Sequence, residues 1–422
     1  MARQGTSKLV KTLGVYTFAN ILNSAIPFLL LPFLTNYLLP SDYAIVDLFQ
    51  AATQFAVAIV GVNTFSALSR FYFDLDNVVF KKYVGNSLII LLISALFLLI
   101  IAFVFKTNIH NLIKIPRDWI WLVVVYAFSL NIIQTLLSIW QVKYKAVKYG
   151  TFRILRTVLD VSLSIFFVLI LKFKWDGRIL GQILAVVLFA ILAILLLIKN
   201  KYVKFDFDLI KIKKLLSFGS PLIIHILGAV IITYSDRVFI VNYIGLEKTG
   251  MYSVGYQVGM IVYLVQTSFN QAWVPWFFEK LKSNIFKDKL KIIRFTYLYY
   301  VLILLLAVVI AVVAPFIYKV FIADSYINGI DIVVWIALGF AFNGMYKMVG
   351  NYIFYIKKTY IISIITLFTA GLNIVLNYFM VNNFGAVGVA QASAISFFTQ
   401  FILTWIISSR MYKMPWLLKK KY

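Results

Sequence analysis

The chain has 422 residues, of which 63% are hydrophobic and only 13% are charged. Soluble globular domains are nearer half apolar and a quarter charged, so this composition argues against a soluble domain and favours a polytopic membrane protein. The net charge is +25 and there are no cysteines, which excludes disulfides and thiolate metal sites.

Apolar runs of about 20 residues recur along the chain, and each is long enough to cross a bilayer as a helix. The first run, from Leu13, follows a short basic start without a small-residue cleavage site, so we expect a retained span rather than a signal peptide. The runs predict an all-α membrane protein with twelve transmembrane helices, over residues 13–38, 42–69, 83–105, 118–142, 150–172, 177–199, 214–243, 249–278, 290–316, 328–356, 359–382 and 384–409.

The basic residues are distributed unevenly between the two predicted membrane faces. Most of the 40 Lys and Arg residues fall in the termini and in the loops after even-numbered spans, such as KYKAVK at 143–148 and the connection at 199–214. The positive-inside rule then predicts that both termini are cytoplasmic. This explanation of the charge is simpler than nucleic-acid binding, and we expect no nucleic-acid partner.

Three sequence patterns of the first half recur in the same order in the second half. Each pair of matching segments is separated by a similar number of residues, so six spans are followed by six similar spans in the same orientation. Parallel repeats of this kind are common in transporters. We therefore predict two parallel six-helix bundles, residues 1–200 and 201–422. The matching segments are 33–50 with 239–257, 144–154 with 355–365, and 177–185 with 385–393.

Polar side chains gather on the first, second and fourth predicted spans of each half. Their spacing places several of them on one helix face, which predicts a central water-filled cavity lined by these six spans. For any single amide, a helix–helix hydrogen bond is the simpler interpretation. The candidate substrate-binding amides are Asn131, Gln134, Gln257, Asn270, Asn343 and Asn351.

Two charges, Asp236 and Arg237, stand side by side in the seventh span. A charge near the centre of a bilayer costs about 3 kcal/mol by insertion scales, so a functional role is expected. Asp236 is a local partner for Arg237, and Asp47 in the second span lies near the same predicted face. An Asp47–Arg237 bridge between the halves would close an outer gate. Alternatively, the two charges in the seventh span are interfacial anchors exposed to headgroups.

Other ionisable residues in the spans have more than one interpretation. His225 is either a buried neutral histidine or a proton-responsive site. Lys347 lies too deep to reach the interface easily and suggests an anionic ligand. Arg153 and Arg156 are either interfacial or extend a basic cavity, and Asp160 is spaced to pair with Arg156.

The segments DRVFIVNYIG (236–245) and GMYSVGYQVG (250–259), within twelve spans in two halves, resemble the polysaccharide transport branch of the multidrug/oligosaccharidyl-lipid/polysaccharide exporters. The resemblance is greatest to the O-antigen (Wzx-type) flippases. It implies a V-shaped, alternating-access transporter in the bacterial cytoplasmic membrane. Such proteins move an undecaprenyl-pyrophosphate-linked oligosaccharide to the outer leaflet for O-antigen, capsule or exopolysaccharide synthesis.

The resemblance also implies partners and site residues. Arg237 and Lys347 fit a basic cavity for the pyrophosphate, while the lipid tail remains among the membrane lipids. Polysaccharide polymerase and chain-length machinery are the expected protein partners. The sequence has no nucleotide-binding loop, and we expect no cofactor. Energy then comes from a proton or sodium gradient, or from substrate supply and removal.

Two other functions remain alternatives. A drug exporter of the same superfamily often carries cationic substrates and would want acids in the cavity, whereas the deep charges here are more often basic. A membrane polysaccharide polymerase or ligase would have large exterior loops with Arg and His, whereas the predicted exterior loops here are short. No catalytic triad or metal cluster is apparent, so a non-enzymatic transporter is favoured.

Overall fold

The computed structural model describes residues 26, 28, 30–283 and 285–417. All regular elements in these residues are helical, as expected for a chain whose backbone polar groups must be satisfied within a membrane. The chain forms two compact units, Met1–Val230 and Ile231–Tyr422, and each is described by itself. Their boundary falls inside a helix. The predicted division at 200/201 concerns the sequence repeat and stays a prediction.

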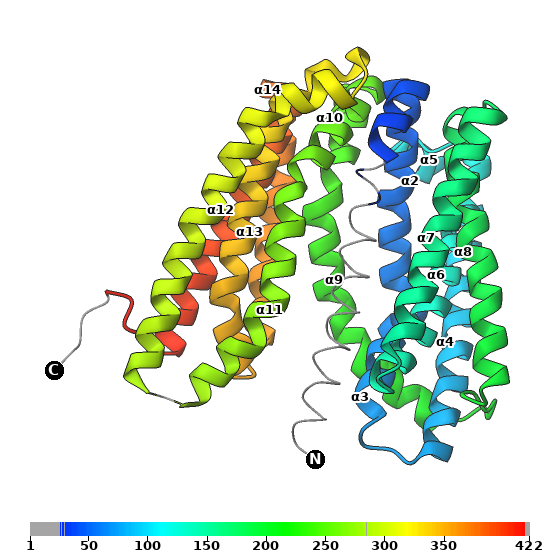
Figure 1. The fold of residues 1–422 in the computed structure, drawn as a ribbon. Coiled ribbons are helices and arrows are strands. Elements are labelled where there is room, and N and C mark those ends of the chain that lie inside the picture. Colours follow the sequence, from blue (N-terminus) through cyan, green and yellow to red (C-terminus); the bar gives the residue numbers. More distant parts are fainter. Residues whose placement is uncertain (1–25, 27, 29, 284, 418–422) are drawn as a thin grey trace. The chain divides into compact units, whose positions relative to one another are not determined.

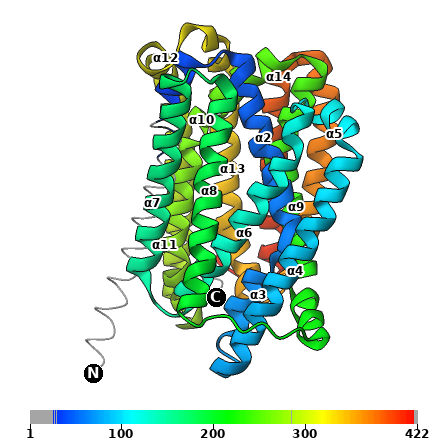
Figure 2. The same cartoon turned by 90° about the vertical axis from the view of Figure 1, so that its right-hand side faces the viewer.

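The first unit is a bundle built around one central helix (Figure 2). Helix α6 (Ile120–Val142) contacts α2, α3, α4, α7 and α8. The other helices are α2 (Pro40–Ile59), α3 (Thr64–Phe71), α4 (Asn77–Val104), α5 (Lys106–Ile113), α7 (Ala146–Ile165), α8 (Lys174–Lys199) and the first part of α9 (Leu209–Tyr243), with short helical turns at Val60–Asn63, Arg117–Trp119 and Phe166–Ile170.

A break separates α2 from α3 where the sequence predicted one continuous span. Gly61, Val62 and Asn63 have φ angles of 77°, 49° and 53°, which interrupt the helical hydrogen bonds. The Ser94 hydroxyl accepts the hydrogen bond of the freed Gly61 N–H at 2.8 Å. A Cβ atom on Gly219 of α9 would lie 2.0 Å from the Val62 carbonyl oxygen, so only glycine permits this close approach.

The second unit is also built around one helix, α13 (Ile330–Tyr355), which lies beside α12 and α14 in Figure 1. It contacts α10, α11, α12 and α14. Gly255 of α10 and Gly329 allow the backbones of the two segments to approach closely, since a Cβ atom on Gly255 would meet the Gly329 carbonyl oxygen. The surrounding helices are α10 (Leu246–Gly259), α11 (Ile261–Ser283), α12 (Phe286–Phe321) and α14 (Tyr360–Met411).

Eight helices in the described part of the chain are long and apolar enough to cross a membrane. The two last predicted spans form one of them, α14, which bends at Gly385 where φ is 62°. The predicted span 249–278 is instead two helices, α10 and α11, and the predicted span 13–38 lies largely outside the described residues. The all-helical membrane fold is therefore confirmed, while the count of twelve and the repeat stay predictions.

Candidate functional site

A fully buried carboxylate, Asp236 of α9, lies at the centre of a polar cluster in the second unit. Tyr252 Oη donates a hydrogen bond to its Oδ2 at 2.5 Å, and Ser393 Oγ donates to the same oxygen at 2.8 Å. Asn377 Nδ2 donates to Oδ1 at 2.9 Å. Three neutral donors from α10 and α14 thus surround the Asp236 carboxyl group.

A second layer of amides and hydroxyls supports these donors. Asn373 Oδ1 accepts hydrogen bonds from Ser235 Oγ at 2.9 Å and from Asn377 Nδ2 at 3.2 Å. Asn373 Nδ2 donates to Ser393 Oγ at 3.3 Å. All four side chains are buried, and Asn377 Oδ1 has no hydrogen-bond partner among the described residues. We call Ser235, Asp236, Tyr252, Asn373, Asn377 and Ser393 the aspartate cluster.

The neighbouring Arg237 is also buried, but its guanidinium lies among tyrosines. Its Cζ atom is 3.8 Å from the centre of the Tyr256 ring and 5.4 and 5.5 Å from those of Tyr252 and Tyr234. Arg237 Nη1 donates to the Thr233 carbonyl oxygen at 2.8 Å. Cation–π contacts of this kind stabilise a desolvated guanidinium. Asp236 and Arg237 are 0% and 2% exposed, so the interpretation as headgroup-exposed anchors is wrong.

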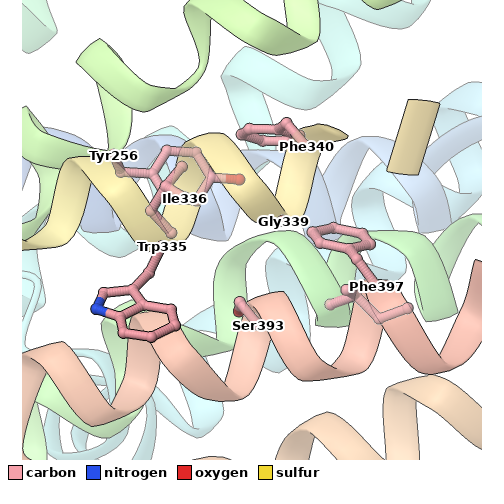
Figure 3. A pocket seen from close by; sticks show the side chains of 8 residues that line it. Tyr256, Trp335, Ile336, Gly339, Phe340, Ser393 and Phe397 are labelled. Carbon is pink, nitrogen blue, oxygen red and sulfur yellow. The ribbon is translucent and has the colours of Figure 1, made fainter. Parts of the chain in front are cut away.

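A small apolar crevice borders the aspartate cluster (Figure 3). Ser393 of α14 and Tyr256 of α10 are among the side chains on its walls, together with Trp335 and Phe340 of α13 and Phe397 of α14. Ser393 bonds to Asp236, and the Tyr256 ring packs against the Arg237 guanidinium. Asp236 and Arg237 thus each contact one residue of the crevice wall.

A second polar feature joins α11 and α13, and we call it the amide ladder. Gln266 Nε2 donates to Asn343 Oδ1 at 3.0 Å, and Asn351 Nδ2 donates to Asn270 Oδ1 at 3.2 Å. Lys347 lies between these two rungs, since positions four apart share one face of a helix. The structure thus brings together Asn270, Asn343, Lys347 and Asn351, four of the candidate residues.

Lys347 has few polar contacts for a largely buried cation. Its Nζ atom is 3.4 Å from Thr267 Oγ1 and 5.0 Å from the centre of the Tyr263 ring. No carboxylate of the described residues lies within ion-pair distance of it. The groups that these contacts place beside the Lys347 ammonium are neutral.

The predicted residues of the first unit are more dispersed. Asn131 is buried and donates to the Ala127 and Val57 carbonyl oxygens, so it joins α6 to α2 as a helix–helix hydrogen bond. Arg153 donates to Tyr149 Oη at 3.2 Å. Gln134, Arg156 and Asp47 are partly exposed.

Asp160 of α7 pairs with Arg178, which lies near the start of the predicted span 177–199. Arg178 Nη1 lies 2.5 Å from Asp160 Oδ1 and also contacts Ser164 Oγ. The expected Asp160–Arg156 pair is therefore wrong. The reason is that α8 packs against α7 and brings Arg178 to Asp160, a helix–helix contact that the spacing along one helix does not reveal.

Two further candidates are located without a defined role. His225 lies in α9, and its side chain is outside the part that the structure describes. Gln257 is partly exposed on α10. Among the described residues no group of three His, Cys, Asp or Glu side chains could hold a metal ion.

Of the aspartate cluster, only Asp236 was among the predicted site residues. The polar face was predicted on the first, second and fourth spans of each half, whereas Asn373, Asn377 and Ser393 lie on the two last predicted spans. A signal was present, because Asn373 and Asn377 are four residues apart in an otherwise apolar run.

Residues 9–280 match the model of a family described as polysaccharide biosynthesis protein. A relative from Haemophilus influenzae, described as an uncharacterized membrane protein, is 26% identical over 364 residues, which cover 83% of this chain and 85% of the relative.

Two solved transporters have similar folds. An inward-facing multidrug resistance MATE family transporter of the MOP superfamily aligns with a TM-score of 0.71 and 17% identity, covering 94% of each chain. The lipid II flippase MurJ, in an inward closed conformation, aligns with a TM-score of 0.73 and 15% identity, covering 96% of this chain and 87% of MurJ. This multi-pass membrane protein therefore belongs to the polysaccharide biosynthesis protein family and has the fold of these transporters.

Proposed function

We propose that the protein is a flippase that moves a polyprenyl-pyrophosphate-linked oligosaccharide across a bacterial cytoplasmic membrane, with both termini in the cytoplasm. The observation that carries this proposal is Lys347, a largely buried cation between two amide rungs. A pyrophosphate or an acidic sugar needs a partly dehydrated cation, and sugar hydroxyls need amides. The fold shared with MurJ, which is named as a lipid II flippase, supports a lipid-linked cargo.

The amide ladder suits such a cargo better than a cationic drug. The charged member of the ladder is a lysine, and its flanking groups are the amides of Asn343 and Asn351. An organic cation would instead require a carboxylate near its path. The cargo passes through unchanged, so the role requires binding groups rather than a catalytic residue. Gln134, Gln257, Arg153 and Arg156 are the other proposed contacts along the path.

We infer that the aspartate cluster couples transport to an ion gradient. Asp236 is buried in α9 and is surrounded by oxygen-bearing side chains, and Asn377 Oδ1 is an acceptor without a partner among the described residues. Carboxylate, amide and hydroxyl oxygens are ligands that suit Na⁺, and a proton would bind the same carboxylate. His225 is a second candidate for proton binding.

The hypothesis that a bridge between Asp47 and Arg237 closes an outer gate stays a prediction. It is tested with the variants Asp47→Arg and Arg237→Asp, alone and combined. A bridge predicts that each single variant loses transport and that the double variant recovers part of it. Equal loss in all three variants, with normal amounts of protein in the membrane, would exclude the pair.

The test of the main proposal uses the protein in its own host. Deletion should leave complete lipid-linked repeat units on the cytoplasmic face, where an impermeant glycosidase added to intact spheroplasts cannot reach them. Restoring the wild-type chain should make them accessible and restore the surface polysaccharide. Polysaccharide polymerase and chain-length machinery are the partners expected to use the exported units.

Two outcomes would overturn this assignment. Single repeat units that reach the outer face without being polymerised would indicate a polymerase. An unchanged distribution of lipid-linked sugars together with new sensitivity to cationic drugs would indicate a drug exporter.

A further inference from the structure

One end of the second unit carries a dense group of exposed basic side chains. They come from the end of α11, the start of α12, the end of α13 and the end of α14, and we call this group the basic end. The acids on these segments are Glu279 and Asp288, and Asp288 already accepts from Ser283 and Lys280. The basic end consists of Lys282, Lys287, Lys357, Lys358, Arg410 and Lys413.

Aromatic contacts show that these four segments meet. Phe278 of α11 packs on Tyr355 of α13 at 5.7 Å between ring centres, and Tyr355 packs on Tyr412, which follows α14, at 5.8 Å. Lys289 of α12 lies 5.4 Å from the centre of the same Tyr412 ring. The basic side chains are therefore neighbours in space.

Trp416 fixes the segment after α14 to this end. Its carbonyl oxygen accepts a hydrogen bond from Tyr297 Oη at 2.8 Å. Its ring lies 5.5 Å from that of Trp405 and 5.9 Å from that of Tyr352. The segment fixed in this way includes Lys413, so it brings this exposed lysine to the same end.

Large apolar side chains are exposed among the basic ones. Ile285 at the α11–α12 turn is 57% exposed, Phe354 at the end of α13 is 47% exposed, and Leu417 is 85% exposed. A mixture of exposed apolar groups, aromatic rings and lysines is typical of a membrane interface, where apolar side chains enter the acyl region and cations reach the headgroups. A surface that binds an acidic protein in water would not favour these apolar groups.

We propose that the basic end is a binding surface for anionic phospholipid headgroups and that Trp416 positions the segment that completes it. Clusters of four to eight Lys and Arg beside a transmembrane helix attract anionic lipid surfaces. The interaction is separate from cargo transport, because none of the basic-end residues belongs to the amide ladder or the aspartate cluster.

The test uses the purified full chain in a neutral detergent, titrated with phosphatidylglycerol, with bound lipids counted by native mass spectrometry. The test variant carries Lys282→Gln, Lys287→Gln, Arg410→Gln and Lys413→Gln. The control carries Lys172→Gln, Lys174→Gln, Lys248→Gln and Lys319→Gln, which removes the same charge from exposed sites elsewhere. Each lost charge is expected to weaken binding by up to about fivefold.

We expect the test variant to bind phosphatidylglycerol at least about tenfold more weakly than the control variant. Trp416→Ala, which leaves the charge unchanged, should also weaken binding and should do so without affecting phosphatidylcholine. Equal binding by the test and control variants, or equal binding of phosphatidylcholine and phosphatidylglycerol by the wild-type chain, would overturn the proposal. Displacement of the lipid by low concentrations of polyglutamate would point to an acidic protein as the partner instead.

Discussion

The buried ionisable side chains have different kinds of partner in the two units. In the first unit, Arg178 and Asp160 neutralise each other directly, with 2.5 Å between their closest atoms. In the second unit, Asp236 is held by neutral donors, and Lys347 has a hydroxyl and an aromatic ring beside it. A charge that is already paired stabilises the fold, whereas a charge held by neutral groups can accept a mobile partner. This difference fits a structural role for Arg178 and Asp160, and it agrees with the transport role proposed above for Asp236 and Lys347.

The largest expected effect is on ion coupling through Asp236. The change Asp236→Asn keeps the shape but removes the charge, so the ion would lose its only carboxylate within the aspartate cluster. Losing a buried charge interaction costs about 2–5 kcal/mol, so gradient-dependent transport should fall by at least about 30-fold. The measurement is cargo transport in proteoliposomes with a sodium gradient, a proton gradient or neither.

A matched control is Asp331→Asn, which removes an acid from the first turn of α13 outside the aspartate cluster. It should leave the gradient dependence unchanged. If Asp236→Asn keeps its gradient dependence, Asp236 does not couple transport to the ion gradient. The proposed cargo would be unaffected by that result.

Lys347 should show a smaller effect on transport and none on folding. A hydrogen bond to a charged group contributes about 1.5–3 kcal/mol, so Lys347→Met should weaken anionic cargo binding by about tenfold to a hundredfold. Lys347→Arg should retain part of it. The thermal stability of Lys347→Met should match or exceed that of the wild-type chain, because the change removes a desolvated cation that has no carboxylate partner among the described residues.

The measurement is binding of a soluble sugar-diphosphate analogue, together with thermal unfolding of the same preparations. Unchanged affinity in Lys347→Met would remove the anion site. A large loss of stability would show instead that Lys347 has a structural role like that of Arg178.

Changes to the ion pair of Asp160 and Arg178 in the first unit should affect the stability of the chain rather than transport. Its side chains are 10% and 26% exposed, so breaking it should cost about 2 kcal/mol, less than a fully buried pair. Asp160→Asn should therefore lower the stability of the chain, and the double variant Asp160→Leu with Arg178→Met should recover most of it. Thermal unfolding checks this, and a transport assay should show near-normal rates for the double variant.

Patterns within a single helix could be predicted from the sequence, whereas contacts between helices could not. Long apolar runs predicted a helical membrane protein, and the i, i+4 spacing of Asn343, Lys347 and Asn351 predicted one face of the amide ladder. The partners of that face on α11 depend on how two helices pack, which a one-dimensional pattern does not contain. Asp236 was a candidate because an acid in an apolar run is unusual.

Two donors to Asp236, Asn377 and Ser393, and the supporting residue Asn373 were harder to find. They lie about 140 residues or more further along the chain, and small polar groups of this kind also occur as helix–helix hydrogen bonds. The break at Gly61 was missed for a related reason. A glycine in an apolar run is common, and the close approach of Gly219 to the Val62 carbonyl at this bend involves a residue far along the chain.

The smallest expected effect concerns the segment that precedes α9, residues 200–208. It contains a charge pair that is more exposed than the pair of Arg178 and Asp160. Lys82 Nζ lies 2.7 Å from Asp206 Oδ2, and Asn86 Nδ2 donates to the Asp206 carbonyl oxygen, so residue 206 is fixed to α4. The hydrogen bond from the Lys82 ammonium lowers the pKa of Asp206. Because this pKa is lowered, the pair stabilises the contact at pH values above the usual aspartate pKa of about 4. The stabilisation is lost as the pH falls through the lowered pKa.

Local opening of the connection should therefore increase only below about pH 4, while the wild-type chain at pH 5–7 shows no change. Limited digestion with pepsin at pH 3 and hydrogen exchange at pH 5–7 would measure it. Asp206→Asn should be equally open at both pH values, because an amide cannot titrate. Equal protection of the wild-type and Asp206→Asn connections at pH 6 would show that the backbone hydrogen bonds to Asn86 hold this segment alone, and that the exposed pair, unlike Arg178 with Asp160, contributes nothing measurable.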